Sequence, residues 1–399
     1  MRIIPVEINQ DQHPSFQLPP SKSVYNRHRV LYHLAKEKMP FPTKGLPADC
    51  TYLDLALNSF DEDVYLGQGG TTLRFYLASR LLQNYQVKIQ VDEQLKSRPI
   101  HPLLDSLEQL GLCIERGWPL HIKPAKKIGN KVFVNASDSS QFVSALALVG
   151  AFLENGLAID WEENLASKSF FELTLRILSE WQIEYTVSKH SIHIKSGFKI
   201  PEQPSISGDW ASASYVIMGA ALRKQSVYLN NLVENTGQPD EELKTMLAPL
   251  GIKLKSLNRG MQAECTVEQM KLIQKDFTNC PDLAPTLCIW HLLKGIPIWF
   301  TGLNTLNKKE SQRLNKLAEL LKDMKLDFSV TADSLFCEVM NPTFPEKYEA
   351  NTEGDHRLAM AFSDLCLKIP DLKLSEVQSV EKSYPQFWEE MRIWKIISN

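Results

Sequence analysis

Residues 282–295 read DLAPTLCIWHLLKG, a polar opening followed by a helix-length stretch that is apolar on nearly every side. A helix of that kind is buried all round rather than lying on a surface. The same pattern recurs in SKSVYNRHRVLYHLA from 21, TTLRFYLASRLL from 71, SSQFVSALALVGAFL from 139, WASASYVIMGAAL from 210 and DHRLAMAFSDLCLK from 355. Successive starts differ by 50, 68, 71, 72 and 73 residues. The chain is therefore predicted to repeat six times, with a short first repeat.

A second series of helices accompanies the first with matching steps. Its members are expected to begin near residues 52, 103, 171, 241, 313 and 387. The stretch 313–324, RLNKLAELLKDM, is typical of an amphipathic helix, because Leu314, Leu317, Leu320 and Leu321 fall on one face. Several of these helices pass through a short turn into strand-like alternation, as in MLAPLGIKLKSL (246–257). Each repeat is predicted to combine two helices with short strands in an α/β fold.

Composition restricts the function classes. A chain of 399 residues is long for one core, which predicts two domains, and its net charge of -3 argues against a nucleic-acid binder. The N-terminus lacks the apolar core of a signal peptide, and the longest apolar run, 142–153, is too short to span a membrane. Seven cysteines without a CxxC pair indicate reduced thiols. We therefore expect a cytoplasmic protein without disulfides, a metal site or a membrane partner.

The openings of the apolar helices carry residues suited to anions. Free backbone N–H groups at a helix start, together with the helix dipole, favour negative ligands. Cations stand in or near these openings: Lys22, Arg27, Arg74, Arg98, Lys309, Arg313, His356, Arg357 and Lys382. If the repeats converge, the substrates should be small and carry more than one anionic group. Taken singly, each residue is equally compatible with an N-cap or a solvated side chain, and the repeat with a scaffold that does no chemistry.

Ten motifs in order resemble those of EPSP synthases. They are LPPSKSVYNR (18–27), LGQGGTTLR (66–74), KSRPI (96–100), SSQFVSALAL (139–148), SKSFFELTL (167–175), GDWASASY (208–215), PDLAPTL (281–287), KESQRL (309–314), GDHRLAMAF (354–362) and EKSYPQFW (381–388). The resemblance covers essentially the whole chain. It implies two similar domains, each of three repeated units of helices and short strands. This arrangement is an inside-out α/β barrel with pseudo-sixfold symmetry and a ligand cleft between the domains.

The resemblance also implies domain boundaries. Residues 19–209 would form the shikimate 3-phosphate-binding domain. Residues 1–18 would join 210–399 in a discontinuous second domain that carries the acid–base and phosphoenolpyruvate-binding residues.

The activity implied is transfer of the enolpyruvyl group of phosphoenolpyruvate to the 5-hydroxyl of shikimate 3-phosphate, without a cofactor, by a monomer acting on two small molecules. The catalytic residues would be Asp282, Glu310 and Lys22. Phosphoenolpyruvate would be held by Lys22, Gly70, Arg98, Gln141, Arg313, Arg357 and Lys382. Shikimate 3-phosphate would be held by Ser23, Arg27, Ser139, Ser140, Gln141, Ser167, Asp282 and Lys309.

The chain departs from the family pattern at Gln68, Phe75, Phe170, Thr305 and Gln312. One alternative is a non-catalytic homologue that only binds a ligand. Another is a UDP-N-acetylglucosamine enolpyruvyl transferase, but that family opens with an AKN-type motif and uses a mobile-loop cysteine. Here the opening is SKS, and the cysteine nearest to KSRPI is Cys113, predicted to lie inside an amphipathic helix. For Glu310, the alternative to catalysis is an ordinary surface ion pair with Arg313, one helical turn along.

Overall fold

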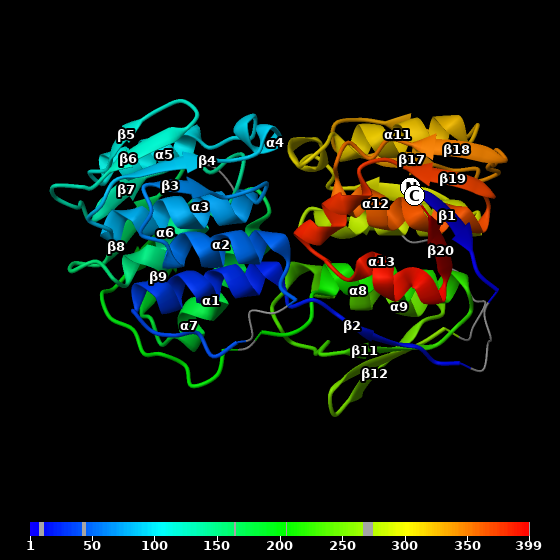
Figure 1. Ribbon diagram of the computed structural model, residues 1–399, viewed down its shortest axis with the longest axis horizontal. Helices are drawn as coiled ribbons and strands as arrows, with labels where there is room; N and C mark the ends of the chain where they lie inside the picture. Colours follow the sequence, from blue (N-terminus) through cyan, green and yellow to red (C-terminus); the bar gives the residue numbers. More distant parts are fainter. Residues whose placement is uncertain (8–11, 42–44, 163–164, 205, 266–273, 399) are drawn as a thin grey trace. The chain divides into compact units, whose positions relative to one another are not determined.

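The computed structural model describes residues 1–7, 12–41, 45–162, 165–204, 206–265 and 274–398 (Figure 1). The chain divides into two compact units. Unit 1 comprises Met1–Pro20 and Ser207–Asn399, and unit 2 comprises Ser21–Ile206. Each unit has its own cluster of buried hydrophobic side chains.

Unit 2 contains six longer helices and eight strands among its described residues. Its helices are α1 (Lys22–Leu34), α2 (Ala48–Asn58), α3 (Gly70–Ser79), α5 (His101–Gln109), α6 (Gln141–Gly150) and α7 (Lys168–Glu180), with a single turn α4 (Glu93–Lys96). Its strands are β3 (Asp63–Tyr65), β4 (Val87–Gln90), β5 (Cys113–Glu115), β6 (Leu120–Lys123), β7 (Lys131–Phe133), β8 (Leu157–Asp160), β9 (Tyr185–Ser188) and β10 (Ser191–Ile194).

Unit 1 follows the same alternation. Its helices are α8 (Trp210–Leu222), α9 (Leu243–Leu247), α10 (Ala284–Lys294), α11 (Arg313–Asp323), α12 (His356–Phe362) and α13 (Phe387–Glu390). Its strands are β1 (Arg2–Pro5), β2 (Ser15–Gln17), β11 (Val227–Asn230), β12 (Lys253–Leu257), β13 (Gly260–Glu264), β14 (Gln274–Asp276), β15 (Ile298–Thr301), β16 (Ser329–Val330), β17 (Leu335–Cys337), β18 (Lys347–Ala350), β19 (Asp371–Leu374) and β20 (Lys395–Ser398).

The described strands form five four-stranded sheets with one shared topology. The orders are β3-β4-β6-β5, β7-β8-β10-β9, β2-β11-β13-β12, β14-β15-β17-β16 and β18-β19-β1-β20. In each sheet the first two strands are parallel, and the third is antiparallel to both its neighbours, as in β3, β4, β6 and β5. The repeated topology confirms the six-fold repeat. The first repeat supplies α1 and α2 but no sheet of its own among the described residues, which accounts for its short length.

The N-terminal segment completes two sheets of unit 1. Strand β1 lies between β19 and β20, antiparallel to both, and Figure 1 shows it in blue beside these orange and red strands. Strand β2 pairs in parallel with β11. A strand from the start of the chain thus completes the open sheet of the last repeat.

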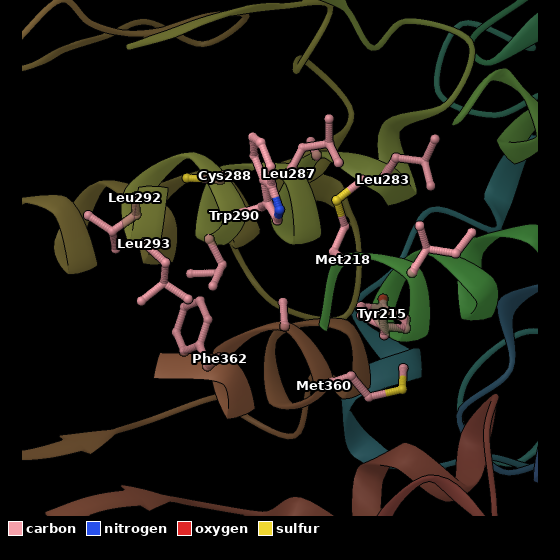
Figure 2. Close-up of a cluster of buried hydrophobic side chains, with 14 of the residues drawn as sticks. Tyr215, Met218, Leu283, Leu287, Cys288, Trp290, Leu292, Leu293, Met360 and Phe362 are labelled. Atoms are coloured by element: carbon pink, nitrogen blue, oxygen red, sulfur yellow. The ribbon is translucent and has the colours of Figure 1, made fainter. Parts of the chain in front are cut away.

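The first helix of each repeat is buried, as the apolar patterning predicts. Every residue of α10 from Ala284 to Leu293 is buried, and α10 packs against both α8 and α12. Figure 2 shows this contact, with Met218 of α8, Leu287 of α10 and Met360 of α12 in one apolar cluster. The helix ends at Gly295, whose φ of 68° is the left-handed conformation that closes a helix without a Cβ penalty.

The second helices are amphipathic and cover the first. In α11 the four leucines predicted to share a face, Leu314, Leu317, Leu320 and Leu321, are all fully buried. One detail of the prediction is wrong, because Cys113 lies outside the amphipathic helix. Helix α5 ends at Gln109, and Cys113 begins β5. A glycine at 111 with φ of 109° turns the chain between them.

The fold class is α/β, as predicted, with the repeat of helices and small sheets. The described part of the structure contains no closed barrel. None of the five sheets formed by the described residues closes on itself, since each remains an open four-stranded sheet. The repetition of sheets, rather than one continuous sheet, gives each unit its regular form.

Candidate active site

Each buried helix of unit 1 opens with an aspartate. Asp209 precedes α8 and accepts a hydrogen bond from the backbone N–H of Ser212. Asp355 precedes α12 and accepts from the N–H groups of Arg357 and Leu358. Asp282 lies in a 3-10 turn (Pro281–Leu283) that leads into α10. These carboxylates neutralise the positive helix ends and place three acids in equivalent positions of the three repeats.

Arg313, the first residue of α11, links the repeats. Its Nε lies 2.6 Å from Oδ2 of Asp355, its Nη1 2.9 Å from Oδ1 of Asp282, and its Nη2 2.5 Å from Oε2 of Glu310. The Arg313 side chain is 1% exposed. Three carboxylates therefore contact one buried guanidinium group, and the planar geometry of its N–H donors orients all three.

Three further cations complete this network. Nη2 of Arg357 lies 2.8 Å from Oδ2 of Asp282, and Nζ of Lys309 lies 3.8 Å from Oδ1 of the same carboxylate. Nζ of Lys382 lies 2.7 Å from Oε1 of Glu310. We call the seven residues the Arg313 network: Asp282, Lys309, Glu310, Arg313, Asp355, Arg357 and Lys382. The structure thus brings together all six residues of unit 1 that the sequence assigned to the site.

The network fixes the charge of its members. Burial alone would raise the pKa of Asp282, but Arg357, Lys309 and Arg313 outweigh it and hold that pKa well below the usual range. Burial alone would likewise lower the pKa of Arg357, but Asp282 raises it well above its ordinary value. Asp282 is therefore an ionised hydrogen-bond acceptor, and Arg357 is a permanent cation.

The surface ion pair proposed as an alternative for Glu310 is wrong in two respects. Glu310 precedes α11, which begins at Arg313, so the pair does not span one helical turn. Neither side chain is on the surface, since that of Glu310 is 10% exposed and that of Arg313 is 1% exposed. A largely desolvated carboxylate between Arg313 and Lys382 is costly to form, which distinguishes it from an ordinary solvated pair.

The predicted lysine of unit 2 lies at the start of α1. Nζ of Lys22 is 2.8 Å from Oδ2 of Asp49, a residue of α2 whose side chain is 2% exposed. Asp49 also accepts a hydrogen bond at its backbone oxygen from Thr72 of α3. Lys22 is thereby oriented by a buried carboxylate that connects α1, α2 and α3.

Gly70 begins α3 and lies against two arginines. A Cβ on Gly70 would stand 2.8 Å from Nη1 of Arg74 and 3.0 Å from Nη1 of Arg98, closer than side chains normally pack. Nη1 of Arg74 also donates to Oε1 of Gln141, 2.6 Å away at the start of α6. Gly70, Arg98 and Gln141, all predicted for the donor, are thus gathered at the openings of α3 and α6.

The predicted serines lie on two adjoining segments. Ser139 and Ser140 precede α6, and Ser167 precedes α7 with φ of 52°. The hydroxyl of Ser140 donates to the backbone oxygen of Ser167 at 3.0 Å, and the hydroxyl of Ser139 accepts from the N–H of Gln141 at 3.2 Å. The two helix openings are therefore held together, and their hydroxyls can serve a phosphate.

Arg27 is enclosed by the protein. Its Nε donates to Thr174 at 2.8 Å, and its two terminal nitrogens donate to the backbone oxygens of Ser23 and Phe170. The guanidinium also lies 5.2 Å from the ring centroid of Phe75. Burial lowers the pKa of Arg27 to about 9. Arg27 therefore connects α1 to α7, and in this structure its donors are directed to protein atoms.

The five departures from the family pattern lie in different surroundings. Phe75 and Phe170 both contact Arg27. Gln312 stands before α11, where its amide oxygen accepts from Asn315. Oγ1 of Thr305 is buried without a hydrogen-bond partner among the described residues. Gln68 lies in the turn before α3, next to Gly69.

Sequence reasoning did not select Asp355 or Asp49 for the site, and it named Arg74 as a cation at a helix opening without giving it a ligand. Asp355 holds Arg313, Asp49 holds Lys22, and Arg74 holds Gln141. A signal for Asp355 was present, because GDW, PDL and GDH place an aspartate before each buried helix of unit 1. Asp49 gives no such signal, since its role depends on the packing of α2 against α1.

Two further properties concern the described part of the chain. Within it, no cluster of three or more His, Cys, Asp or Glu side chains has the arrangement of a metal site. No helix there has the length and apolar character needed to cross a membrane.

The chain is similar to a well-defined family. The family model described as EPSP synthase (3-phosphoshikimate 1-carboxyvinyltransferase) matches residues 53–391. A 3-phosphoshikimate 1-carboxyvinyltransferase of Bacteroides fragilis is 29% identical over 395 residues, which cover 95% of this chain and 94% of the relative. A protein of the same name from Dehalococcoides mccartyi is 30% identical over 334 residues, covering 82% of this chain and 78% of that protein.

Solved structures show the same architecture. An EPSP synthase from Acinetobacter baumannii superposes with a TM-score of 0.76 over the whole of both chains at 19% identity. The enolpyruvyl transferase NikO from Streptomyces tendae superposes with a TM-score of 0.69 at 11% identity, covering 98% of this chain and 96% of that one. At these identities the likeness concerns the fold, and two differently named transferases share it.

Proposed function

The chain belongs to the EPSP synthase family, and on that premise we propose that it transfers the enolpyruvyl group of phosphoenolpyruvate to shikimate 3-phosphate. The residues that carry this proposal form the Arg313 network, in which two candidate acid–base carboxylates lie among four cations. A reaction between two anionic substrates that also moves protons requires both kinds of group.

The chemistry proceeds by addition and elimination. The 5-hydroxyl oxygen of the acceptor bonds to C2 of phosphoenolpyruvate and loses its proton, while C3 gains a proton and becomes a methyl group. The tetrahedral intermediate then loses phosphate from C2 and a proton from C3, which restores the double bond. The proton gained at C3 is released again, and the proton of the hydroxyl leaves with the phosphate, so the reaction balances without an oxidant, a reductant or another co-reactant.

The cations of unit 1 are proposed to hold the donor. Arg313 and Arg357 present planar guanidinium groups suited to carboxylate and phosphate, and Lys382 adds a third charge. Each is ion-paired with Asp282, Glu310 or Asp355, so its position is set before a ligand arrives. Preorganised cations lose little entropy on binding and stabilise the negative charge on the departing phosphate.

The two carboxylates are proposed to have different tasks. Asp282 has a lowered pKa, so it serves first as an acceptor that orients the hydroxyl of shikimate 3-phosphate. Its basicity rises when the anionic groups of a bound donor share the positive charge of Arg313 and Arg357, which then stabilises ionised Asp282 less. Glu310 contacts Lys382 directly, so these two side chains can pass a proton to and from C3.

Unit 2 is proposed to supply the remaining groups. Lys22, Gly70, Arg98 and Gln141 would bind the donor. The acceptor would use Ser23, Arg27, Ser139, Ser140, Gln141 and Ser167, with the serine hydroxyls on its phosphate, together with Asp282 and Lys309 of unit 1. In domain terms, residues 19–209 would form the shikimate 3-phosphate-binding domain, and residues 1–18 with 210–399 would carry the acid–base residues.

The test is release of inorganic phosphate. We expect steady-state release with phosphoenolpyruvate and shikimate 3-phosphate together, and none with either alone. Substituting UDP-N-acetylglucosamine for shikimate 3-phosphate should give no turnover. This arm tests the identity of the acceptor, which the shared fold alone does not specify. Absence of turnover with both proper substrates would leave a ligand-binding homologue and reject the enzyme.

We also propose that the protein works as a cytoplasmic monomer. The seven cysteines, which all lie in the described part of the chain, support this location, because all are free thiols and none is paired in a disulfide, as is usual in a reducing compartment. Light scattering at several concentrations would test the oligomeric state, and fractionation of the native cell would test the location.

A further inference from the structure

Asp240 is a buried carboxyl group that the proposed mechanism does not use. It lies in a 3-10 turn, η2 (Pro239–Glu242), and is 6% exposed. The residue before the turn, Gln238, donates its amide hydrogens to Ser207 Oγ and Gly208 O, and accepts from the N–H of Trp210. Asp240 is thereby fixed beside the opening of α8.

Its surroundings do not support a negative charge. Oδ1 of Asp240 is buried without a hydrogen-bond partner among the described residues. Across the same part of the chain, Asp240 has no ion pair with a lysine or arginine. An ionised carboxylate in that condition would lose its hydration without a direct ion pair to replace it, whereas the protonated acid loses far less.

The charged groups nearby include acids as well as bases. Those that act on Asp240 or face it are Asp209 before α8, Cys280 and Asp282 before α10, Lys309 before α11 and Arg357 of α12. On α9, which packs against η2, Lys244 is paired with Glu241. Burial, with a further contribution from Asp282, raises the pKa of Asp240 to about 8, against the lowering effects of Arg357 and Lys309.

The state of Asp240 decides the charge available to a donor. The Arg313 network contains four cations and three carboxylates, so it carries one net positive charge. An ionised Asp240 beside it would cancel that charge, and Arg357 would have two acids to neutralise instead of one. A neutral Asp240 leaves the excess charge for an anionic ligand.

We propose that Asp240 is a positioning residue for phosphoenolpyruvate binding, which acts as a neutral acid and so leaves Arg357 with Asp282 as its carboxylate partner. The proposal rests on the proposed function, since it names a further determinant of the donor site. Asp240 acts through Arg357 and takes no part in the transfer of protons.

The pH dependence of donor binding follows. As the pH rises from 7 to 9, Asp240 loses its proton and adds a negative charge next to Arg357. The KM for phosphoenolpyruvate should then rise roughly tenfold, since the added negative charge weakens the attraction of Arg357 for an anionic donor. In Asp240→Asn the side chain is neutral at every pH, so the ratio of the KM values at pH 9 and pH 7 should fall to about one.

The experiment measures kcat and the KM of each substrate between pH 6.5 and 9.5 for the native enzyme, Asp240→Asn and Glu242→Gln. Glu242 is an exposed carboxylate of the same turn, so its variant controls for loss of a charge nearby and should keep the native ratio. Thermal unfolding of each variant establishes that it is folded.

Three results would overturn the inference. The first is that Asp240→Asn keeps the ratio of phosphoenolpyruvate KM values at pH 9 and pH 7 that the native enzyme has. The second is that the pH changes only the KM of shikimate 3-phosphate. The third is that Asp240→Asn loses more than tenfold in kcat/KM at pH 7, which would show that Asp240 works as a carboxylate. Calorimetric titration of phosphoenolpyruvate into the same proteins without acceptor repeats the comparison as dissociation constants. Failure of the proposed function is distinct, because it appears as absence of phosphate release in the native protein at every pH.

Discussion

Replacing Glu310 by glutamine separates proton transfer from charge in the Arg313 network. The carboxylate contacts Arg313 at 2.5 Å and Lys382 at 2.7 Å. Glutamine fills the same space, and its oxygen can keep one of these contacts, while its NH2 group must face the other cation. The substitution therefore removes one negative charge and one charge-assisted hydrogen bond, which lowers the free energy of unfolding by about 1–3 kcal/mol.

The kinetic effect should be much larger than the effect on binding. An amide does not exchange a proton near neutral pH, so kcat should fall by about 10²–10⁴ if Glu310 carries protons at C3 of the donor. The KM for phosphoenolpyruvate should stay the same or fall slightly, because the four cations of the network lose a competing anion.

The assay is continuous detection of phosphate with each substrate varied in turn. Glu319→Gln is the matched control, since Glu319 is an exposed carboxylate on α11 paired with Lys316. It makes the same chemical change on the adjoining helix and should alter kcat by less than about twofold. A folded Glu310→Gln enzyme with near-native kcat would remove Glu310 from the mechanism and leave it as a structural ion pair.

Three further predictions follow from single contacts. Asp282→Asn should lower kcat and raise the KM for shikimate 3-phosphate more than that for phosphoenolpyruvate, measured by initial rates; a larger effect on the donor KM would contradict its assignment to the acceptor. Gly70→Ala should raise the donor KM with a smaller change in kcat, because the methyl displaces the guanidinium groups of Arg74 and Arg98; an unchanged donor KM would refute the proposed contact. Burial lowers the pKa of His291 to about 4. Between about pH 6.5 and 4 the unfolded chain therefore binds a proton at this side chain and the folded chain does not, so the free energy of unfolding should fall as the pH drops through that range. Denaturant unfolding of His291→Leu should show a weaker dependence over that range, and an equal slope would exclude His291.

Much of the fold could be predicted from local patterns. Helix starts recur with a steady step, and the apolar faces of α10 and α11 are visible as periodicity within one helix. The strand pairing could not be predicted in this way, because β1 and β2 pair with strands that lie hundreds of residues later in the sequence. Cys113 was misplaced although a local signal was present, since Gly111 follows the last residues of the helix and turns the chain into β5.

The candidate site could be predicted as a set of residue types but not as a network. Lys22, Arg313 and Arg357 stand at helix openings, where cations are informative. Their partners Asp49 and Asp355 are as buried as core residues, and only the folded chain gives them a role. For Arg27 the sequence suggested a ligand contact, whereas the structure surrounds the guanidinium with protein acceptors.

The sequence by itself determined the six repeats with two helices in each, the buried faces of these helices and the cations at their openings. Each of these features depends on residues that are only a few positions apart in the sequence. Tertiary structure alone decided that Arg313 lies among carboxylates from separate segments and that the side chain of Glu310 is only 10% exposed. It also decided that Asp240 has an oxygen without a hydrogen-bond partner among the described residues. These features depend on which openings meet when the sheets of unit 1 form with strands from the N-terminal segment. The charge and protonation of a side chain follow from burial and from neighbours distant in sequence, and no local pattern specifies either.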